Sequence, residues 1–383
     1  MERELEKLKT VINELKSEFY ERDDLIEGAV CALLTSSHVI IIGPPGTAKS
    51  QLANELCSRV KGANYFQWLL TKFSTPEEIF GSVSLKGLEN DEYRRVLTNK
   101  LPEAHVAFLD EIFKSSSSIL NSILTVINER IYFNGTEKIN TPLISLFGAS
   151  NELPSDEDEL DALYDRFLLR FVVGYIEEDF RFLKMIGNKD DVGKNTSITI
   201  KELQNLQHGV QKVVIPQTIY KLVLRLRTEL SSKNIILSDR RYKSAISLIQ
   251  AKAFINGRET ACEEDIKILE NVLWKDPAQI SDIKTTIHSV LFGFREQLKE
   301  LYIQAKEIEA YSKQKWEDEE TKIKANIEAQ TKLKMLINKV DVLSEELTDR
   351  GISTNEVSEI KVQIEDVKKE ILNSLIDPKQ AVI

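Results

Sequence analysis

Short apolar runs alternate with helical patterns between about residues 39 and 175. The runs are rich in β-branched and aromatic residues, and segments long enough for crossover connections separate them: HVIIIG, YFQWLLT, HVAFLDE, LISLFGASN and FLLRFVVGY. Runs that are apolar throughout, rather than alternating with polar residues, are typical of parallel strands that are buried on both faces. The pattern therefore predicts an α/β core with a mostly parallel sheet of five strands covered by helices.

Helical periodicity dominates on both sides of this core. Leu5, Leu8, Ile12 and Leu15 fall at helical spacing, and a second helix is predicted over residues 24–35. Beyond the core, residues 177–280 contain few strand-like runs. We therefore divide the chain into N-terminal helices that pack on the core (1–36), the α/β core (37–176), a small helical lid domain (177–280) and a C-terminal region (281–383).

The C-terminal region changes composition to Lys, Glu and Ile, with almost no Gly or Pro. Two series of apolar residues step by three and four: Leu333, Leu336, Val340, Leu343 and Leu347, then Val357, Ile360, Ile364, Val367 and Ile371. The breaker TDRGIST separates them, and Ser353 with Glu356 can form a capping box. This spacing predicts an antiparallel coiled-coil hairpin, with a third helix over residues 286–311. The hairpin can be a solvated spacer or a partner-docking arm.

Composition excludes several classes of protein. The longest apolar runs are too short for a membrane-spanning helix, and the charged N-terminus lacks a signal-peptide core, so we expect a cytoplasmic protein with no membrane span. Neither the 3 cysteines nor the 4 histidines show ligand spacing, which predicts neither disulfides nor zinc. A formal net charge of −10 makes nucleic acid an unlikely partner and favours protein partners.

The stretch GPPGTAKS at residues 43–50 follows the first apolar run and precedes a helical pattern. Backbone N–H groups of such a loop, and of the helix N-terminus after it, can bind phosphate oxygens. Lys49 can neutralise the β- and γ-phosphates, and the hydroxyl of Ser50 can bind Mg²⁺. The predicted phosphate-binding residues are Gly43, Pro44, Pro45, Gly46, Thr47, Ala48, Lys49, Ser50 and Gln51.

Ala48 stands where the general phosphate-loop pattern has glycine. We expect this position to have entered the helix with a negative φ, where Ala is a good helix former. On that expectation the alanine is compatible with a working loop.

Paired carboxylates end the third apolar run, at Asp110 and Glu111. At the carboxyl end of a strand beside a phosphate loop, Asp110 can help to hold Mg²⁺ while Glu111 polarises the attacking water. Asn151, at the end of a later run, can donate to a γ-phosphate oxygen or orient that water. Asn134 and Gly135 lie between strand-like runs and predict a hairpin, which can face a pore or lie plainly on the surface.

Taken together, the motifs resemble those of AAA+ ATPases of the MoxR group, and more closely its RavA-like branch. The resemblance covers the chain from about residue 20 to residue 274, in the order of the family, and rests on GPPGTAKS, TKFSTPEEIFG, FLDEIFK, ILTVINERIYFNG, ASNELP, ALYDRFLLR and SDRRYKSAI. MoxR-like loops usually carry alanine at the position of Ala48. The resemblance therefore implies that the loop binds ATP.

Roles for single residues follow from the resemblance. It implies that Lys49 and Ser50 belong to Walker A, that Asp110 and Glu111 form Walker B, and that Asn151 is sensor 1. Arg166 is similar to the arginine finger that reaches the γ-phosphate of the neighbouring subunit, with Arg170 as the second choice. The resemblance also places sensor 2, an arginine of the lid acting on its own subunit's nucleotide, at Arg241 rather than Arg240. A guanidinium suits this task because phosphoryl transfer spreads negative charge over the γ-oxygens.

At the level of the assembly, the resemblance implies a homo-oligomeric ring, usually a hexamer, that uses ATP and Mg²⁺ to remodel or activate a protein client. MoxR-like ATPases commonly act with a protein that bears a von Willebrand factor A domain. RavA-like proteins interrupt their C-terminal helices with a small β-rich docking domain, and residues 281–383 show no strand-rich insertion of that kind. A client inferred from that docking domain therefore does not carry over.

Other functions stay open on the sequence alone. Asn188, Lys189 and Asp191 match the N-K-x-D spacing of guanine recognition, but no strand precedes them and no D-x-x-G follows the phosphate loop. A scaffold that binds ATP only to assemble is a second alternative, against which the intact Lys49 and Glu111 argue. A nucleic-acid motor is a third, and the acidic composition argues against it.

Overall fold

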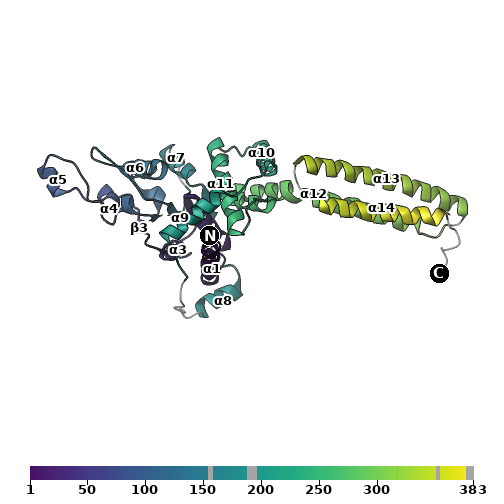
Figure 1. The fold of residues 1–383 in the computed structure, drawn as a ribbon, viewed down its shortest axis with the longest axis horizontal. Coiled ribbons are helices and arrows are strands. Elements are labelled where there is room, and N and C mark those ends of the chain that lie inside the picture. The colour runs from purple at the N-terminus through teal and green to yellow at the C-terminus, as the bar shows by residue number, and fades with distance from the viewer. Residues whose placement is uncertain (154–157, 188–195, 317, 351–353, 377–383) are drawn as a thin grey trace. The chain divides into compact units, whose positions relative to one another are not determined.

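The computed structural model describes residues 1–153, 158–187, 196–316, 318–350 and 354–376, whose path is drawn in Figure 1. They form two compact units, one of residues 1–215 with 237–280 and one of residues 216–236 with the chain from 281 onward. The domain boundaries expected at residues 36, 176 and 280 stay predictions.

A five-stranded sheet lies at the centre of the first unit, in the order β3-β4-β7-β1-β8. Every neighbouring pair in it is parallel. Its strands are the five apolar runs of the sequence: β1 (Val39–Ile42), β3 (Tyr65–Leu69), β4 (Val106–Asp110), β7 (Ser145–Ser150) and β8 (Leu169–Val172). All residues of β1 and β7 are buried, because helices cover the sheet. The predicted sheet is confirmed, and its parallel order places the carboxyl ends of β4, β7 and β1 side by side.

Two N-terminal helices pack in the same unit, as the periodicity predicted. They are α1 (Glu2–Glu18), which buries Leu8, Ile12 and Leu15, and α2 (Asp23–Thr35). A Cβ on Gly28 of α2 would come within 2.3 Å of the Phe171 ring in β8, so this helix lies too close to the sheet for a larger residue. In addition, Glu27 pairs with both Lys16 of α1 and Lys252, which ties the two helices to a third segment of the unit.

The remaining elements of this unit are mostly helical. They are α3 (Lys49–Ser58), β2 (Val60–Lys61), α4 (Pro76–Phe80), α5 (Leu85–Glu89), η1 (Leu101–Glu103), η2 (Ile112–Lys114), α6 (Ser117–Glu129), β5 (Ile131–Asn134), β6 (Glu137–Asn140), α7 (Asp158–Arg166), α8 (Asp179–Gly187), β9 (Ile198–Thr199), α9 (Ile200–Gln211), α11 (Asp239–Ile255), η3 (Glu263–Asn271) and η4 (Pro277–Gln279).

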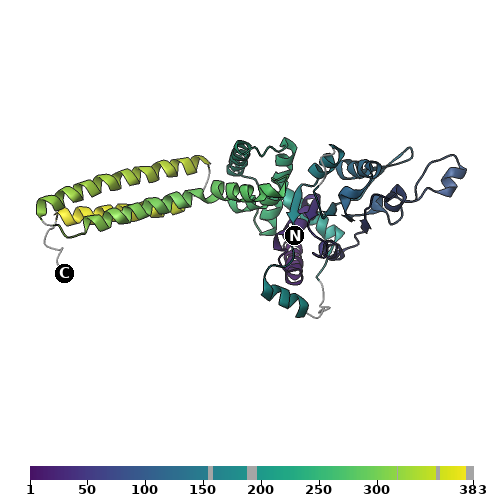
Figure 2. The same cartoon turned by 180° about the vertical axis from the view of Figure 1, so that it is seen from behind.

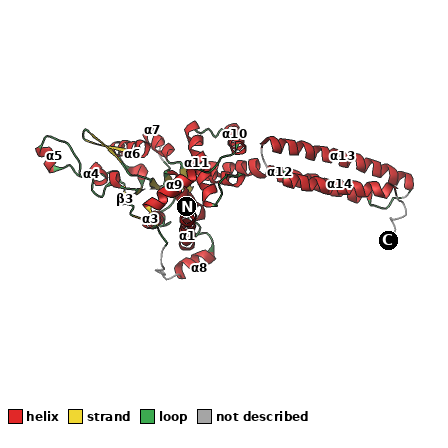
Figure 3. Cartoon of the chain, in the orientation of Figure 1, coloured by secondary structure: helices red, strands yellow, loops and turns green. Residues whose placement is uncertain are grey.

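The predicted hairpin forms between β5 and β6, which pair in antiparallel register with Asn134 opposite Glu137. The Asn134 side chain binds the backbone of Arg95, accepting from its N–H at 2.7 Å and donating to its carbonyl at 3.1 Å. Gly135 has a φ of +66°, and a Cβ there would meet the carbonyl oxygen of Tyr93 at 2.1 Å. The hairpin is therefore fastened to the segment that follows α5. Figure 3 shows the helices of the chain in red and its strands in yellow.

The second unit contains four helices among its described residues: α10 (Gln217–Ser232), α12 (Ile280–Ser312), α13 (Glu319–Arg350) and α14 (Asn355–Ile376). Helices α13 and α14 lie side by side in both views (Figures 1 and 2). Polar contacts link Gln330 to the carbonyl of Lys368 and Asp341 to Lys361, so the two helices run antiparallel.

Helix α12 extends this bundle, because Arg295 binds Glu356 of α14 through two hydrogen bonds at 2.9 and 2.7 Å. The expected helical C-terminal region is confirmed, and within its described residues there is no strand. Whether it acts as a spacer or a docking arm stays a prediction. The possible capping residue Ser353 and the N-K-x-D stretch at residues 188–191 lie outside the described residues.

None of the described helices is both long enough and apolar enough to cross a membrane.

Candidate active site

The loop of residues 43–50 connects β1 to α3 at the carboxyl edge of the sheet. Its first residue, Gly43, continues the strand pairing, since its N–H donates to the carbonyl of Ser150 at 3.0 Å. A Cβ on Gly43 would come within 2.1 Å of the carbonyl oxygen of Val173, so only glycine fits between the neighbouring strands. Thr47 is buried and its hydroxyl donates to the carbonyl of Pro44, which closes the turn.

Ala48 does not have the conformation expected from the sequence. It has a φ of 62° and a ψ of 22°, the left-handed region, and it is the N-cap of α3 rather than part of the helix. The expectation of a negative φ was wrong because the chain must reverse once more before the helix begins at Lys49. An alanine in this region is strained by about 1–2 kcal/mol. Gly46 is also left-handed, with a φ of +81°.

Lys49 is folded back onto its own loop. Its ammonium donates to the carbonyls of Gly43 at 2.6 Å and Pro44 at 2.9 Å, and to the Asn151 side-chain oxygen at 3.3 Å. Burial lowers the pKa of Lys49, and the carboxylates of Asp110 and Glu111 act against that shift. The positive charge of Lys49 is therefore held beside the loop by two carbonyls and an amide, which a phosphate could replace.

Asp110 ends β4, and Glu111 directly after it has a left-handed φ of 52°. The Asp110 carboxylate accepts the backbone N–H of Glu111 at 3.0 Å. One carboxylate oxygen of Glu111 accepts a hydrogen bond from the side-chain amide of Asn151, and the other lies 3.2 Å from the ammonium of Lys114. Non-glycine residues in this backbone region are uncommon and often occur at functional sites.

At the carboxyl edge, the Asn151 side chain thus contacts both Lys49 and Glu111. Lys49 and Asn151 are 102 residues apart in the chain. Each of the three residues follows one of the adjacent strands β1, β4 and β7. The sequence predicted that these side chains would meet. It did not identify Lys114, whose position three residues after Glu111 on η2 brings its charge to the same carboxylate.

Ser50 and Asp110 offer the hydroxyl and carboxylate oxygens that Mg²⁺ prefers. Both are half-buried beside Lys49 and Glu111. The described residues contain no cluster of three or more metal-binding side chains. Mg²⁺ in nucleotide sites usually has only one or two protein ligands together with phosphates and water, so the residues present fit such an ion.

Arg166 lies at the other edge of the sheet. It ends α7 and lines a cavity with Ser37 and His38, which immediately precede β1. Strand β1 covers three residue steps, or roughly 10 Å, between that edge and the phosphate loop. Arg166 makes no ion pair or hydrogen bond with the residues that the structure describes. Its place in this cavity separates Arg166 from the loop of its own chain.

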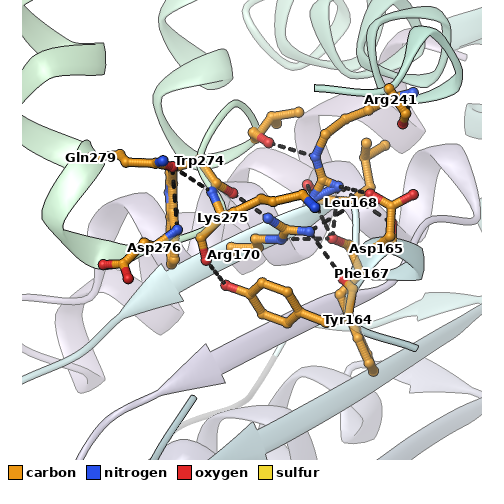
Figure 4. A network of polar contacts seen from close by, with 12 residues as sticks. Tyr164, Asp165, Phe167, Leu168, Arg170, Arg241, Trp274, Lys275, Asp276 and Gln279 are labelled. Carbon is orange, nitrogen blue, oxygen red and sulfur yellow. Dashed lines mark hydrogen bonds and ion pairs between the residues drawn. The ribbon is translucent and has the colours of Figure 1, made fainter. Parts of the chain in front are cut away.

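Arg170, the second choice for a finger, is fully buried in β8 (Figure 4). Its guanidinium donates to the carbonyls of Trp274 and Tyr164 and lies 3.9 Å from the centre of the Tyr164 ring. A guanidinium held in this way cannot reach another subunit. The sequence favoured Arg166 over Arg170 but could not show that Arg170 is buried, because its partner Trp274 lies 104 residues away.

Arg241 is also buried, and it belongs to the same network (Figure 4). It donates to the carbonyls of Val272 at 2.9 Å and Phe167 at 2.7 Å, and it lies 3.7 Å from the carboxylate of Asp165. Burial and the nearby charge of Arg170 lower the pKa of Arg241 to about 9, so it stays charged at neutral pH. Contact with its own nucleotide would require Arg241 to leave these partners and cross the sheet.

The exposed Arg240 lines the same cavity as Arg166. A catalytic role for either arginine stays a prediction.

Comparison with known families bears directly on this arrangement. Residues 6–208 match the family described as the MoxR domain in the MoxR-vWA-beta-propeller ternary systems. The chain belongs to the MoxR group of AAA+ ATPases. Residues 218–287 of this MoxR-type ATPase match an AAA lid domain. Membership of the RavA-like branch stays a prediction.

The chain is also similar to individual proteins. The chain is 43% identical over 295 residues to the uncharacterized protein MJ0079 of Methanocaldococcus jannaschii, covering 77% of each chain. It is 25% identical over 292 residues to the chaperone MoxR1 of Mycobacterium tuberculosis, covering 70% of this chain and 75% of that one. A crystal structure of a Cytophaga hutchinsonii protein described as an ATPase has the same fold, with a TM-score of 0.61 and 17% identity over 76% of this chain and 94% of that one.

Proposed function

We propose that this MoxR-type ATPase binds ATP at the loop of residues 43–50 and hydrolyses it where two copies of the chain meet in a ring. The contact of Lys49, Asn151 and Glu111 at one edge of the sheet carries the proposal. Lys49 supplies a cation for the phosphates, Asn151 an amide and Glu111 a carboxylate base, and hydrolysis of a γ-phosphate requires such groups side by side.

Within one copy, ATP would displace the loop carbonyls that now hold Lys49, because a phosphate is a stronger partner for an ammonium than a peptide carbonyl. Asn151 would then be free to donate to a γ-oxygen or to the attacking water. Release of Asn151 also frees an oxygen of Glu111, which can accept the proton of that water. Mg²⁺, held by Ser50 and Asp110, would neutralise charge that develops on the β- and γ-oxygens.

Between copies, the finger would come from the next subunit. The position of Arg166 at the amino edge of the sheet supports this, because it is far from its own loop and has no partner among the described residues. In a head-to-tail ring the amino edge of one copy can face the carboxyl edge of the next. Arg240, exposed in the same cavity, is then a better second cation than the buried Arg241, and it would act on the neighbour's nucleotide.

The assembly is proposed to be a hexamer in the cytoplasm that remodels or activates a protein client. The matched family is described by its systems with von Willebrand factor A and β-propeller proteins, and we extend a von Willebrand factor A partner to this chain on that basis.

The experiment is to measure ATP binding and ATP turnover separately for the wild type and for Lys49→Met, Glu111→Gln and Asn151→Ala. Lys49→Met should lose binding, while Glu111→Gln should bind ATP and lose turnover. Lys201→Met, at an exposed lysine of α9, is the matched control and should behave as the wild type. Binding of ATP by a wild type that shows no turnover at any protein concentration would instead favour an assembly scaffold.

A further inference from the structure

The cavity beside Arg166 is unusually rich in positive charge. It has a volume of about 150 Å³, and its lining includes Arg130, Arg166, Arg240 and Arg241 but only one carboxylate, that of Asp165. Asp165 already lies 3.7 Å from Arg241 and 3.9 Å from Arg170. Among the described residues, no further carboxylate lines the cavity to compensate this positive charge.

Arg130 is the arginine that the sequence reasoning missed. It is the C-cap of α6, and its left-handed φ of 57° turns the chain from that helix into β5. One terminal nitrogen donates to the carbonyl of Ser36 at 2.6 Å and to that of Ile144 at 3.3 Å. The guanidinium is thus fixed at the amino edge of the sheet, at the start of β1 and β7.

The other terminal nitrogen of Arg130 is buried without a hydrogen-bond partner among the described residues. No carboxylate that the structure describes pairs with Arg130 either. Burial lowers the pKa of Arg130 to about 10, and the positive charge of Arg130 adds to burial in lowering the pKa of the adjacent His38 to about 3. A buried cation with no counter-charge is costly unless an anion arrives.

We propose that Arg130 is a further arginine acting between subunits, beside Arg166 and Arg240, and that this cavity receives the triphosphate of the nucleotide bound by the neighbouring copy. The inference rests on the proposed function and adds a residue to it. No described carboxylate pairs with Arg130, and the loop proposed to bind this copy's own phosphates lies at the opposite edge of the sheet, so a neighbouring copy would supply the anion. Arg166 would contact the γ-phosphate, and Arg130 would hold the side of the same group that faces the cavity wall.

The test compares ATP turnover of Arg130→Gln, alone and mixed with Glu111→Gln. Loss of one charge-assisted contact predicts a turnover roughly ten- to a hundredfold lower for Arg130→Gln alone. In mixed rings, a copy with an intact Glu111 can meet a neighbour with an intact Arg130, so the mixture should turn over ATP faster than either variant alone. Size measurements should show that Arg130→Gln still assembles. Arg94→Gln, an exposed arginine outside the cavity, is the matched control and should keep wild-type turnover.

Arg130→Lys addresses the risk that the glutamine variant does not fold. It keeps a positive charge and one donor for the Ser36 carbonyl, but it cannot reproduce the two-sided fork of arginine. It should therefore fold, lose turnover and be restored by mixing. Wild-type turnover in either variant, or a loss that mixing with Glu111→Gln does not restore, would overturn the proposal.

Three further outcomes distinguish a role of Arg130 in turnover from a role in assembly and from failure of the proposed function. Loss of assembly instead of turnover would mean that the cavity binds an acidic side chain of the neighbour, which also overturns it. If Arg166→Ala is restored by Glu111→Gln and Arg130→Gln is not, the inference fails while the proposed function stands. If the wild type does not hydrolyse ATP, the proposed function itself fails.

Discussion

Replacing Ala48 by glycine should stabilise the protein. Ala48 has a φ of 62°, and its Cβ is the source of the strain in that conformation. The substitution removes the Cβ from a half-buried loop position and takes away no hydrogen bond, because only the backbone of Ala48 contributes to the cap of α3. The same change in an unstrained helix has the opposite sign, since glycine there loses more conformational entropy.

The magnitude follows from these two opposing effects. A left-handed alanine costs about 1–2 kcal/mol, and glycine costs about 0.5–1 kcal/mol more than alanine in backbone entropy. The free energy of unfolding should therefore rise by about 0.5–1 kcal/mol. For a unit of this size, 1 kcal/mol corresponds to an increase in Tm of roughly 2–4 °C.

Thermal unfolding followed by circular dichroism measures this, with Ala162→Gly as the control in the middle of α7. Ala162 is exposed and helical, so its replacement should lower the free energy of unfolding by about 1 kcal/mol. ATP turnover of Ala48→Gly should stay at the wild-type level because glycine readily adopts the same φ. A fall in Tm for Ala48→Gly comparable to that of the control would refute the left-handed conformation of the loop.

Three other changes test separate parts of the structure. Since the pKa of His38 is lowered to about 3 from an ordinary value near 6.5, the unfolded state binds the extra proton between these values, and stability should fall by about 1.4 kcal/mol per unit as pH drops below about 6.5. In urea titrations between pH 6.5 and 5, His38→Gln should remove this dependence of the free energy of unfolding on pH. If His38→Gln shows the same pH dependence as the control His208→Gln, at an exposed histidine, the burial of a neutral His38 is contradicted. Arg170→Met should lower the free energy of unfolding by about 3 kcal/mol in urea, because it removes the donation to the buried carbonyls of Trp274 and Tyr164 and one of the two arginines beside Asp165. A loss below about 1 kcal/mol would mean that these contacts contribute little to stability. Asn134→Ala should speed hydrogen exchange of the amides in residues 82–96, because it removes both contacts with the Arg95 backbone, and exchange as slow as in Asn140→Ala, at an exposed residue of β6, would exclude that anchoring.

The sheet and the contact among Lys49, Asn151 and Glu111 could be predicted because both depend on local patterns. Each strand that is buried on two faces needs a continuous apolar run, and the polar residue directly after such a run must lie at the carboxyl edge. Glu111 and Asn151 directly follow β4 and β7, and Lys49 follows β1 after the loop of residues 43–48, so the sequence places all three at that edge.

Burial of single arginines could not be predicted in the same way. Arg166 and Arg170 lie four residues apart in one motif. Arg166 lines a cavity, whereas Arg170 is buried and donates to the carbonyl of Trp274. Arg241 donates to the carbonyl of Phe167, which precedes β8, and to that of Val272, which follows η3. Arg130 donates to carbonyls that precede β1 and β7. These partners are distant in the chain, so no spacing in the sequence indicates them. The conformation of Ala48 was missed because it depends on how the loop closes before α3.

Turnover in mixtures of Arg166→Ala and Glu111→Gln, at constant total protein and varying ratio, tests most directly whether the active site is shared between subunits. Each variant alone should assemble and be nearly inactive, since an arginine finger is worth roughly a thousandfold or more in rate. Turnover should then rise to a maximum at an intermediate ratio, because a copy with intact Glu111 and Lys49 meets a neighbour with intact Arg166. Turnover that stays at the level of the two inactive variants at every ratio, while wild-type rings are active under the same conditions, would place Arg166 in its own subunit's site or outside catalysis altogether.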